Sequence, residues 1–396
     1  MRKTTAGVQT SIDSTGGIVA TINETGKRNK RGEHIDRPCR ANLQPRHMKN
    51  CNLLAQRQQR RTFRAVLHTW FGHAGRELPW RMNPNLYKTV VSEFMLQQTQ
   101  VNTAIPYFRK WIKRFPDFAA LAKARESTVL KHWEGLGYYS RARNLHKLAR
   151  VIVKSDSVPK SAEDWASYPG IGPYTSRAIA SIRFGQPTAC VDGNVIRVIA
   201  RLTGYSEEFK DTASASRILQ RHATMLLDNK SPGTHNEAMM ELGATVCSRK
   251  EPKCQECPVE SFCSAKKAGM LDQIPRFKTV QYTRSRANRA FSENGGSILL
   301  QRNSNVGRRL SGQWELPTMT AVGALTQKTD LIGKRSRTIG KDRIEESIYK
   351  VRPTRELMQR VRDQRDLKWA TNAELARLTL SGPHRRWVEE IQAGNS

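Results

Sequence analysis

Apolar residues recur at helical spacing along residues 61–265, and this pattern predicts an all-α domain. Within 86–115 the apolar side chains collect on one helical face, and Glu93 lies beside that face. Glycines at 135 and 137 interrupt a second long helical stretch. The predicted helices cover 64–73, 86–115, 117–154 with a break at 135–137, 195–204, 215–228 and 235–247.

A different pattern begins after 266–288, which is basic and is interpreted as a linker. In 289–393 short apolar runs alternate with turn residues, which predicts a smaller α+β domain. The predicted elements there are strands at 295–302, 346–351 and 366–370, a strand end at 312–317, a charged helical segment at 352–366 and a closing helix at 384–392. Residues 1–60 lack periodicity and carry 12 Lys and Arg against 4 Asp and Glu, so we expect a disordered basic tail.

The charge of the chain favours a polyanionic partner. Its 396 residues include 67 Lys and Arg against 35 Asp and Glu, a formal net charge of +32 at pH 7. Such a charge attracts nucleic acid and does not determine the fold. Neither an apolar run long enough to span a membrane nor a long basic amphipathic helix occurs, so we expect no membrane association.

Four of the seven cysteines lie close together in the loop 247–263. Cys247, Cys254, Cys257 and Cys263 have the spacing C-x6-C-x2-C-x5-C, which allows four thiolates to close around one metal centre. Zinc sites usually pair two short C-x2–4-C hooks, whereas this loop contains one such hook. The spacing therefore favours a [4Fe–4S] cluster and leaves zinc as the alternative.

A turn rich in glycine precedes the helical pattern that starts near residue 173. Gly170, Ile171 and Gly172 fit a helix-hairpin-helix, whose backbone N–H groups hold a DNA phosphate. An ordinary turn between two helices is the alternative. Asp192 follows about twenty residues later, before Gly193 and Asn194, and on sequence alone it could equally be a helix N-cap.

Together these features resemble the endonuclease III superfamily of base-excision DNA glycosylases, and within it the adenine DNA glycosylases of the MutY type. The resemblance covers about 62–265. It rests on the hairpin, Asp192, the cysteine spacing and the segments RELPWR (76–81), VSEFMLQQTQV (91–101), GLGYYSRARNLHKLA (135–149), VDGNVIRV (191–198) and NEAMMELGATVC (236–247). It implies removal of adenine mispaired with 8-oxoguanine or guanine in double-stranded DNA. It also implies a [4Fe–4S] cofactor, and we expect a monomer.

The resemblance also implies roles for four catalytic residues. Glu93 is expected to protonate the departing adenine, and Asp192 to stabilise or attack the cationic sugar, because oxocarbenium-like chemistry uses one acid and one carboxylate. Asn194 and Tyr174 are expected to hydrogen-bond there. Superfamily members that also cut the strand carry a lysine at position 174, so Tyr174 predicts a monofunctional glycosylase. Without the motif, Glu93 would be read as a solvated charge on a helix.

Two groups of substrate contacts follow from the same resemblance. Tyr138 is expected to wedge into the base stack beside Leu136, and core packing is the alternative for Tyr138 and Trp80. The residues expected near the opposing lesion are Gln97, Gln98 and Thr99. Those expected in the adenine pocket are Arg76, Leu78, Trp80 and Glu237.

The second domain resembles the Nudix-like recognition domain of that family more weakly, through SILLQR (297–302), GQWELP (312–317) and LTLSGPHRRW (378–387). It lacks the G-x5-E-x7-R-E-x2-E-E pattern of Nudix hydrolases. The expected lesion-reading loop is 336–351, with Lys341 near the place of the usual histidine. Three alternative functions are a bifunctional glycosylase/lyase for oxidised pyrimidines, a non-catalytic iron–sulfur DNA-binding protein, and a Nudix hydrolase with a helical appendage. The expected location is cytoplasmic and DNA-associated, or nuclear or mitochondrial in a eukaryote.

Overall fold

The computed structural model describes residues 9–12, 18–21, 52–303, 312–324 and 330–394. The chain divides into two compact units, Met1–Arg46 and His47–Ser396. In the first unit, β1 (Gln9–Ile12) and β2 (Ile18–Thr21) form an antiparallel pair inside the segment expected to be a disordered tail. The remainder of that expectation, up to residue 51, lies outside the described residues.

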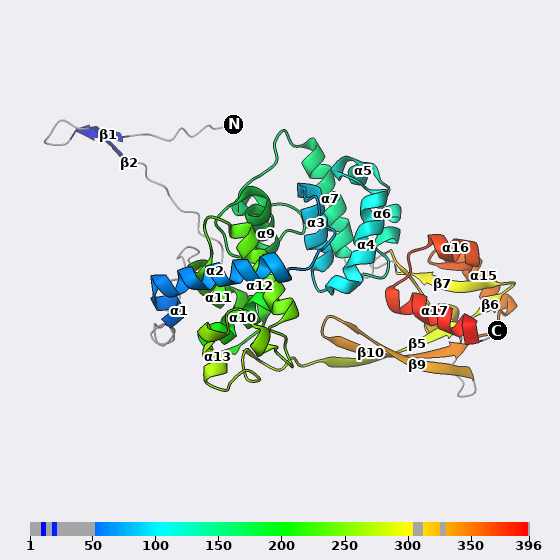
Figure 1. Ribbon diagram of the computed structural model, residues 1–396. Coiled ribbons are helices and arrows are strands. Elements are labelled where there is room, and N and C mark those ends of the chain that lie inside the picture. Colours follow the sequence, from blue (N-terminus) through cyan, green and yellow to red (C-terminus); the bar gives the residue numbers. More distant parts are fainter. Residues whose placement is uncertain (1–8, 13–17, 22–51, 304–311, 325–329, 395–396) are drawn as a thin grey trace. The chain divides into compact units, whose positions relative to one another are not determined.

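The second unit begins with a helical part (Figure 1). Helices start at Asn52, earlier than the predicted boundary at 61, and the long patterns at 86–115 and 117–154 are each divided by loops. The helices are α1 (Asn52–Ala55), α2 (Arg57–Ala74), α3 (Leu86–Leu96), α4 (Val101–Arg114), α5 (Phe118–Lys123), α6 (Glu126–Trp133), α7 (Ser140–Lys154), α8 (Ala162–Ala166), α9 (Pro173–Phe184), α10 (Gly193–Thr203), α11 (Thr212–Leu226), α12 (Pro232–Thr245) and α13 (Ser264–Lys267).

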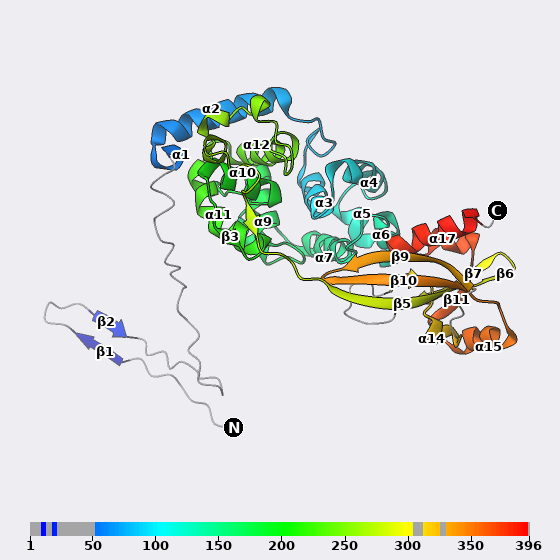
Figure 2. The ribbon, with the colours of Figure 1, turned by 90° about the horizontal axis from the view of Figure 1, so that it is seen from below.

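The helical part has two hydrophobic cores. One joins α1 and α2 to α10–α13, and its fully buried side chains include Phe63 and Phe209. The other is built mainly from α3–α7, and Trp111, Trp133 and Trp165 are fully buried in it. Helix α3 belongs to one core and α10 to the other, and Figure 2 shows the two helices in different halves of the helical part.

A tight hairpin connects α8 to α9, as the sequence predicts. Gly170 has φ +76°, and a Cβ added there would lie 2.5 Å from the Asn144 Cβ. Both the conformation and the close approach therefore require glycine at this position. Ile171 is buried under the turn, whereas Gly170 and Gly172 are exposed. The hairpin backbone is thus open to solvent and anchored by one apolar side chain.

The C-terminal part is α+β, with helices on both sides of two small sheets (Figure 2). One sheet has the order β5 (Thr283–Phe291), β10 (Asp342–Lys350), β9 (Leu331–Ile339), with β5 parallel to β10. In the other, β7 (Ser297–Arg302) pairs antiparallel with β11 (Leu367–Thr371), β6 (Glu293–Asn294) and β8 (Trp314–Glu315). On β7, Ile298 and Leu300 face one core and Leu299 faces the other, which is the alternation expected of a strand between two helical layers.

The helices of this part are α14 (Met319–Val322), α15 (Arg355–Asp363), α16 (Asn372–Arg377) and α17 (Gly382–Gly394). The predicted strands, the charged helical segment and the closing helix are all present. The predicted linker 266–288 is partly wrong, because β5 starts inside it at Thr283. Within it, β4 (Arg276–Phe277) also pairs with β3 (Glu208–Phe209), a short strand in the part predicted to be all-α.

Two sequence motifs of the C-terminal part meet in a buried ion network. Glu315 of GQWELP and His384 of GPHRRW lie beside Glu346 on β10, with Arg289 and Arg337 as the cationic partners. The Leu316 N–H donates to Nδ1 of His384 at 3.0 Å, so the ring proton resides on Nε2, 3.2 Å from the Glu346 carboxylate. These motifs therefore hold the two sheets and α17 together.

Among the described residues, no helix combines the length and the apolar character that crossing a membrane requires.

Candidate active site

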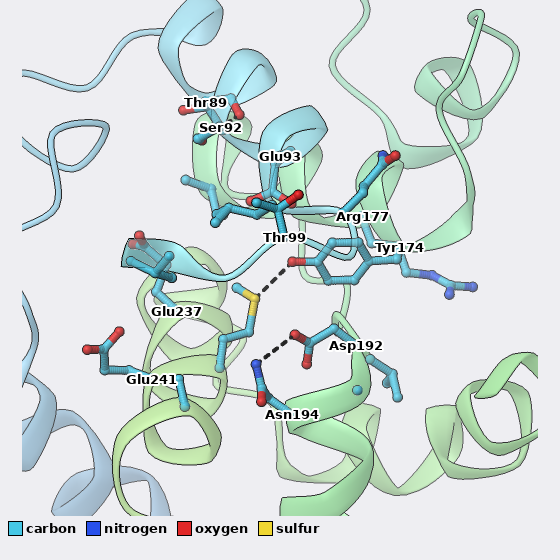
Figure 3. Close-up of a pocket in the computed structure, with 18 of the residues that line it drawn as sticks. Thr89, Ser92, Glu93, Thr99, Tyr174, Arg177, Asp192, Asn194, Glu237 and Glu241 are labelled. Carbon is cyan, nitrogen blue, oxygen red and sulfur yellow. Dashed lines mark hydrogen bonds between the residues drawn. The ribbon is translucent and has the colours of Figure 1, made fainter. Parts of the chain in front are cut away.

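A cleft of about 1660 Å³ opens between the two helical cores. All four predicted catalytic residues line it, as do the residues predicted for the adenine pocket and for the opposing lesion. The cleft-lining residues from these predictions are Glu93, Tyr174, Asp192, Asn194, Arg76, Leu78, Trp80, Glu237, Gln97, Gln98 and Thr99. Figure 3 shows Glu93, Tyr174 and Asp192 reaching the cleft from three different helices.

Glu93 lies on the inward face of α3 and is only 6% exposed. Its Oε2 atom is buried and has no hydrogen-bond partner. Burial raises the pKa of Glu93 to about 7, and the charges of Asp192 and Glu237 act in the same direction. Tyr174 and Arg81 oppose the rise in pKa. The carboxyl group therefore holds its proton close to neutral pH, as an acid catalyst must.

Asp192 is the N-cap of α10 and belongs to the opposite wall of the cleft. Its Oδ1 accepts from the Val195 N–H at 2.7 Å, and its Oδ2 accepts from the Asn194 amide at 3.3 Å. Burial raises the pKa of Asp192, while these hydrogen bonds favour its ionised form. Both the N-cap interpretation and the catalytic one are therefore compatible with the structure, because one oxygen caps the helix and the other faces Asn194.

Gly243 on α12 allows α12 to pack closely against Asn194, the residue whose side-chain amide donates to Asp192. A Cβ added to Gly243 would lie 2.6 Å from the Asn194 Cβ and 3.0 Å from the Asn194 carbonyl oxygen. Any larger residue would push α12 away from the first turn of α10. The close approach also lets Arg197 bridge the two helices, donating to the Gly243 carbonyl and to Oδ1 of Asn194.

Tyr174, at the start of α9, lies between the two carboxylates in Figure 3. Its hydroxyl donates to the Met240 sulfur at 3.0 Å. Burial, followed by the charges of Glu93 and Asp192, raises the pKa of this phenol well above its usual range. Tyr174 is thus a neutral hydrogen-bonding group, and it offers no amine to the cleft.

The sequence did not reveal the ion pairs that hold the adenine-pocket residues. Arg76 binds Glu241, while Glu237 pairs with Arg81, which also reaches Glu241. Glu241 is almost fully buried. Two features of the sequence could have pointed to these residues. Arg81 is the last residue of the RELPWR segment, and Glu241 lies one helical turn after Glu237, on the same face of the helix. Trp80 lines the cleft and also packs edge-on against Phe108 in the core.

The remaining predicted DNA contacts lie outside the cleft lining. Tyr138 is 57% exposed, so core packing does not account for it. Leu136 is buried in the second core beneath it. Gly170, Ile171 and Gly172 form the separate hairpin described above. The structure therefore groups the predicted residues into one cleft, one exposed aromatic loop and one backbone hairpin.

The four clustered cysteines line one small cavity beside α10 and α13. Burial and the neighbouring thiols raise the pKa of Cys257 to about 11. Arg201 donates to the Cys247 sulfur at 3.3 Å, and Arg197 donates to the Cys247 carbonyl at 2.7 Å. Within the described part of the chain, no group of three or more histidine, cysteine or acidic side chains is arranged to hold a metal ion. The guanidinium group of Arg197 joins this cavity to the cleft, because it contacts both the Cys247 carbonyl and Oδ1 of Asn194.

Comparison with known proteins places these residues in a family. A model described as "HhH-GPD superfamily base excision DNA repair protein" matches residues 91–223. The adenine DNA glycosylase of Homo sapiens is 43% identical over 223 residues, covering 54% of this chain and 41% of that protein. A solved thermostable thymine-DNA glycosylase is 26% identical, covers 53% of this chain and 98% of that chain, and has a TM-score of 0.48.

The match spans less than half the length of the human relative, and 44% of the rat and mouse relatives. The adenine DNA glycosylase of Mycolicibacterium smegmatis is covered further: it is 40% identical over 206 residues, which are 51% of this chain and 69% of that protein. On this evidence the chain belongs to the adenine DNA glycosylase family.

Proposed function

We propose that this protein is a monofunctional DNA glycosylase, which removes adenine mispaired with 8-oxoguanine or guanine from double-stranded DNA. The observation that carries the proposal is one cleft that contains a buried carboxylic acid, Glu93, opposite a hydrogen-bonded carboxylate, Asp192. The names of the relatives support adenine as the base removed. Because the match covers part of those relatives, the activity and the mismatch are proposals for this chain.

In the proposed reaction, the adenine nucleotide leaves the stack and enters the cleft, since its glycosidic bond is inaccessible within the duplex. Glu93 donates its proton to a ring nitrogen of adenine while the bond between that base and the sugar breaks. Asp192 stabilises the positive charge left on the sugar. Water then adds to the sugar cation, and the proton that it releases restores the acid form of Glu93, which leaves free adenine and an abasic site.

Tyr174 supports the absence of a strand-cutting step. Lyase activity requires an amine that forms a Schiff base with the opened sugar. The phenol at position 174 instead donates to Met240 and lies beside Glu93 and Asp192, so it can orient the sugar without bonding to it. The alternative, a bifunctional enzyme for oxidised pyrimidines, lacks support at this position.

A [4Fe–4S] cluster is the cofactor that we propose for the cysteine cavity. Four thiols around one cavity fit its ligand set, and the residues that would hold it are Cys247, Cys254, Cys257 and Cys263. When bound, such a cluster supplies iron–sulfur bonds that fix these four side chains. The Cys247 carbonyl would then be a rigid acceptor for Arg197, which in turn positions Asn194.

Replacement of one ligand tests this cofactor. The variant Cys257→Ser is expected to lose the visible absorption of an iron–sulfur protein and most of its iron, because serine is a poor ligand for the cluster. Iron and zinc are measured by elemental analysis of the purified protein. Cys190→Ser, at a buried cysteine outside the cavity, should keep the colour. A colourless parent protein with one zinc per chain would show that the site binds zinc instead.

For the C-terminal part we propose a Nudix-like recognition role without pyrophosphate hydrolysis. Its support is the α+β arrangement with helices on both sides of the sheets, together with the missing hydrolase pattern. Lys341 lies at the turn between β9 and β10, in the loop expected to read the lesion. We propose that the protein is associated with DNA, in the cytoplasm of a bacterium or in the nucleus or mitochondrion of a eukaryote.

A nicking assay with the full chain tests the proposed function. Labelled duplexes carry adenine opposite 8-oxoguanine, guanine or thymine, and each is divided into samples with and without hot alkali. We expect strand breaks only after alkali and only at the two mismatches, since alkali cleaves abasic sites. Breaks without alkali would support the bifunctional alternative. The absence of strand breaks from every duplex, even after alkali, would contradict the proposal.

A further inference from the structure

Arg141, in the first turn of α7, makes an unusual set of contacts. The residue is only 6% exposed, yet its guanidinium group donates to oxygens of two separate loops. Its Nη1 lies within hydrogen-bonding distance of the Phe94 carbonyl at 3.0 Å and the Met95 carbonyl at 2.9 Å, both in the last turn of α3. It also reaches the Gln97 carbonyl and the Thr99 hydroxyl, the latter at 3.2 Å, in the loop that follows. In the loop before α7 it reaches the carbonyls of Leu136 at 3.0 Å and Gly137 at 3.2 Å.

The charge of Arg141 is held without a carboxylate. It forms no ion pair with any residue that the structure describes, and its surroundings are carbonyls, one hydroxyl and the rings of Trp133 and Tyr138, at 5.3 and 5.4 Å from the guanidinium carbon. Burial lowers the pKa of Arg141 to about 10, so the group stays protonated at neutral pH. A buried cation that lacks a counter-ion costs stability. The cost is offset by the carbonyls that the guanidinium satisfies, and these carbonyls belong to the end of α3 and to two loops, so Arg141 ties the three segments together.

The two loops that Arg141 joins contain strained backbone. Within the described ranges, three residues other than glycine have positive φ: Asn83 at 49°, Gln98 at 58° and Tyr138 at 48°. Gln98 lies in one of the two loops and Tyr138 in the other. Such conformations cost about 1–3 kcal/mol each and persist only where the surroundings enforce them. Arg141 contacts Gln97 and Thr99 on either side of Gln98, and Gly137 directly before Tyr138.

We infer that Arg141 is a positioning residue, which joins the loops 97–99 and 135–138 into one rigid element that pushes the target adenine out of the base stack. This inference rests on the proposed function, in which Tyr138 enters the stack and Gln98 lies near the opposite base. Arg141 is not among the residues that line the cleft, so its role is to position the loops. Its Nη1 faces the end of α3 and the loop 97–99, while its Nη2 faces Leu136 and Gly137, and the planar guanidinium holds these two nitrogens in a fixed arrangement.

The variant Arg141→Lys tests the inference, because lysine keeps the charge and loses the planar fork. Excision is measured under single-turnover conditions on two duplexes. In one the adenine lies opposite 8-oxoguanine, and in the other it lies opposite an abasic site and has no pairing partner. We expect the rate on the paired adenine to fall about 100-fold, as for a displaced positioning group. The unpaired adenine needs little help to leave the stack, so its rate should fall by less than about tenfold.

The control is Arg150→Lys on the same helix, whose Nε donates to the Ala122 carbonyl from an exposed position. It should leave both rates unchanged. If Arg141→Lys reduced the excision rate equally on both substrates, its effect would lie in the cleft and the inference would be wrong. Unchanged rates on both substrates would also overturn the inference. If the parent protein releases no adenine from either duplex, the proposed function has failed instead.

A second variant covers the case in which Arg141→Lys does not fold. Thr99→Val removes the hydroxyl that both terminal nitrogens of Arg141 contact. We expect a loss of several-fold on paired adenine, equal opposite 8-oxoguanine and opposite guanine, because the change acts through the loop. A loss confined to 8-oxoguanine would show that Thr99 contacts only the lesion, and it would overturn the inference.

Discussion

The substitution Asp192→Asn is expected to reduce the single-turnover rate of adenine release by about 10³-fold or more, while binding to the mismatched duplex is retained. The reason is the charge that develops on the sugar as the base leaves. In a cleft shielded from water, a carboxylate next to that charge is worth several kcal/mol. The amide of asparagine has nearly the same shape and carries no charge.

The helix that presents Asp192 should survive the change. Asparagine is as good an N-cap as aspartate, so the Val195 N–H keeps an acceptor and α10 keeps its first turn. The hairpin at Gly170–Gly172 and the basic surface of the protein are untouched. Affinity for a duplex with adenine opposite 8-oxoguanine, measured by gel shift, should therefore change little and should still fall steeply as salt is added.

The matched control is Asp117→Asn. Asp117 is also an N-cap, of α5, and accepts from the Ala120 N–H at the same 2.7 Å, but it is exposed and lies outside the cleft. This variant should retain full activity. If Asp192→Asn turned over at the parental rate, Asp192 would be a structural cap and the proposed mechanism would be wrong. If it lost duplex binding as well, the loss of activity would say nothing about the charge on the sugar.

The helical part of the fold was predictable because its apolar residues recur at helical spacing and its turns carry glycine. The hairpin followed from local signals, and the helix predicted at 195–204 is present as α10, which starts two residues earlier at Gly193. Boundaries were less certain. The break at 97–100 could not be distinguished from helix by its residues, because the chain there is fixed by tertiary contacts such as that of Arg141 with the Gln97 carbonyl.

Strands β5 and β9 escaped prediction for a different reason. Both are rich in arginine, and most of their residues are exposed or half-buried, so they lack the apolar alternation that marks a strand. They are held by pairing with β10 and by Arg289 and Arg337, which bind Glu346 between the sheets. Charge that is buried in a network looks the same in a sequence as charge on a solvated surface.

The same limit applies to the candidate site. Glu93 and Asp192 were identified through a family resemblance, and the structure brings both into one cleft. Their supporting cations could not be ranked from the sequence, because Arg81, Arg141 and Arg197 are three among many basic residues. What distinguishes them is burial and bonding partners, which only the folded chain provides.

Adenine release is expected to slow as the pH rises above about 7, approaching a tenfold loss for each further pH unit. Only the protonated form of Glu93 can donate to the base, and burial raises its pKa to about 7. Single-turnover rates between pH 5.5 and 9 would show this descending limb. Glu93→Gln should reduce the rate by about 10²- to 10⁴-fold and abolish the limb, because an amide has no proton to give.

The position of the limb should depend on the neighbouring charges. Glu237 raises the pKa of Glu93, so Glu237→Gln should move the midpoint to lower pH. Glu163→Gln, at an exposed glutamate of α8, should leave the midpoint in place. A profile that rises through neutral pH in the parent protein would require Glu93 to act ionised, and it would remove the acid role proposed here.

The raised pKa of Glu93 also predicts a gain in stability for Glu93→Gln. Between pH 4.5 and about 7 the unfolded chain loses the carboxyl proton and the folded chain keeps it, so the folded state becomes less stable as the pH rises. Above pH 7 that loss amounts to about 3 kcal/mol. The variant, which has no such proton, should therefore unfold at a higher temperature than the parent at pH 8, and the difference should vanish near pH 4.5. A variant that is inactive but no more stable at pH 8 would mean that folding does not raise the pKa of Glu93 above its value in the unfolded chain.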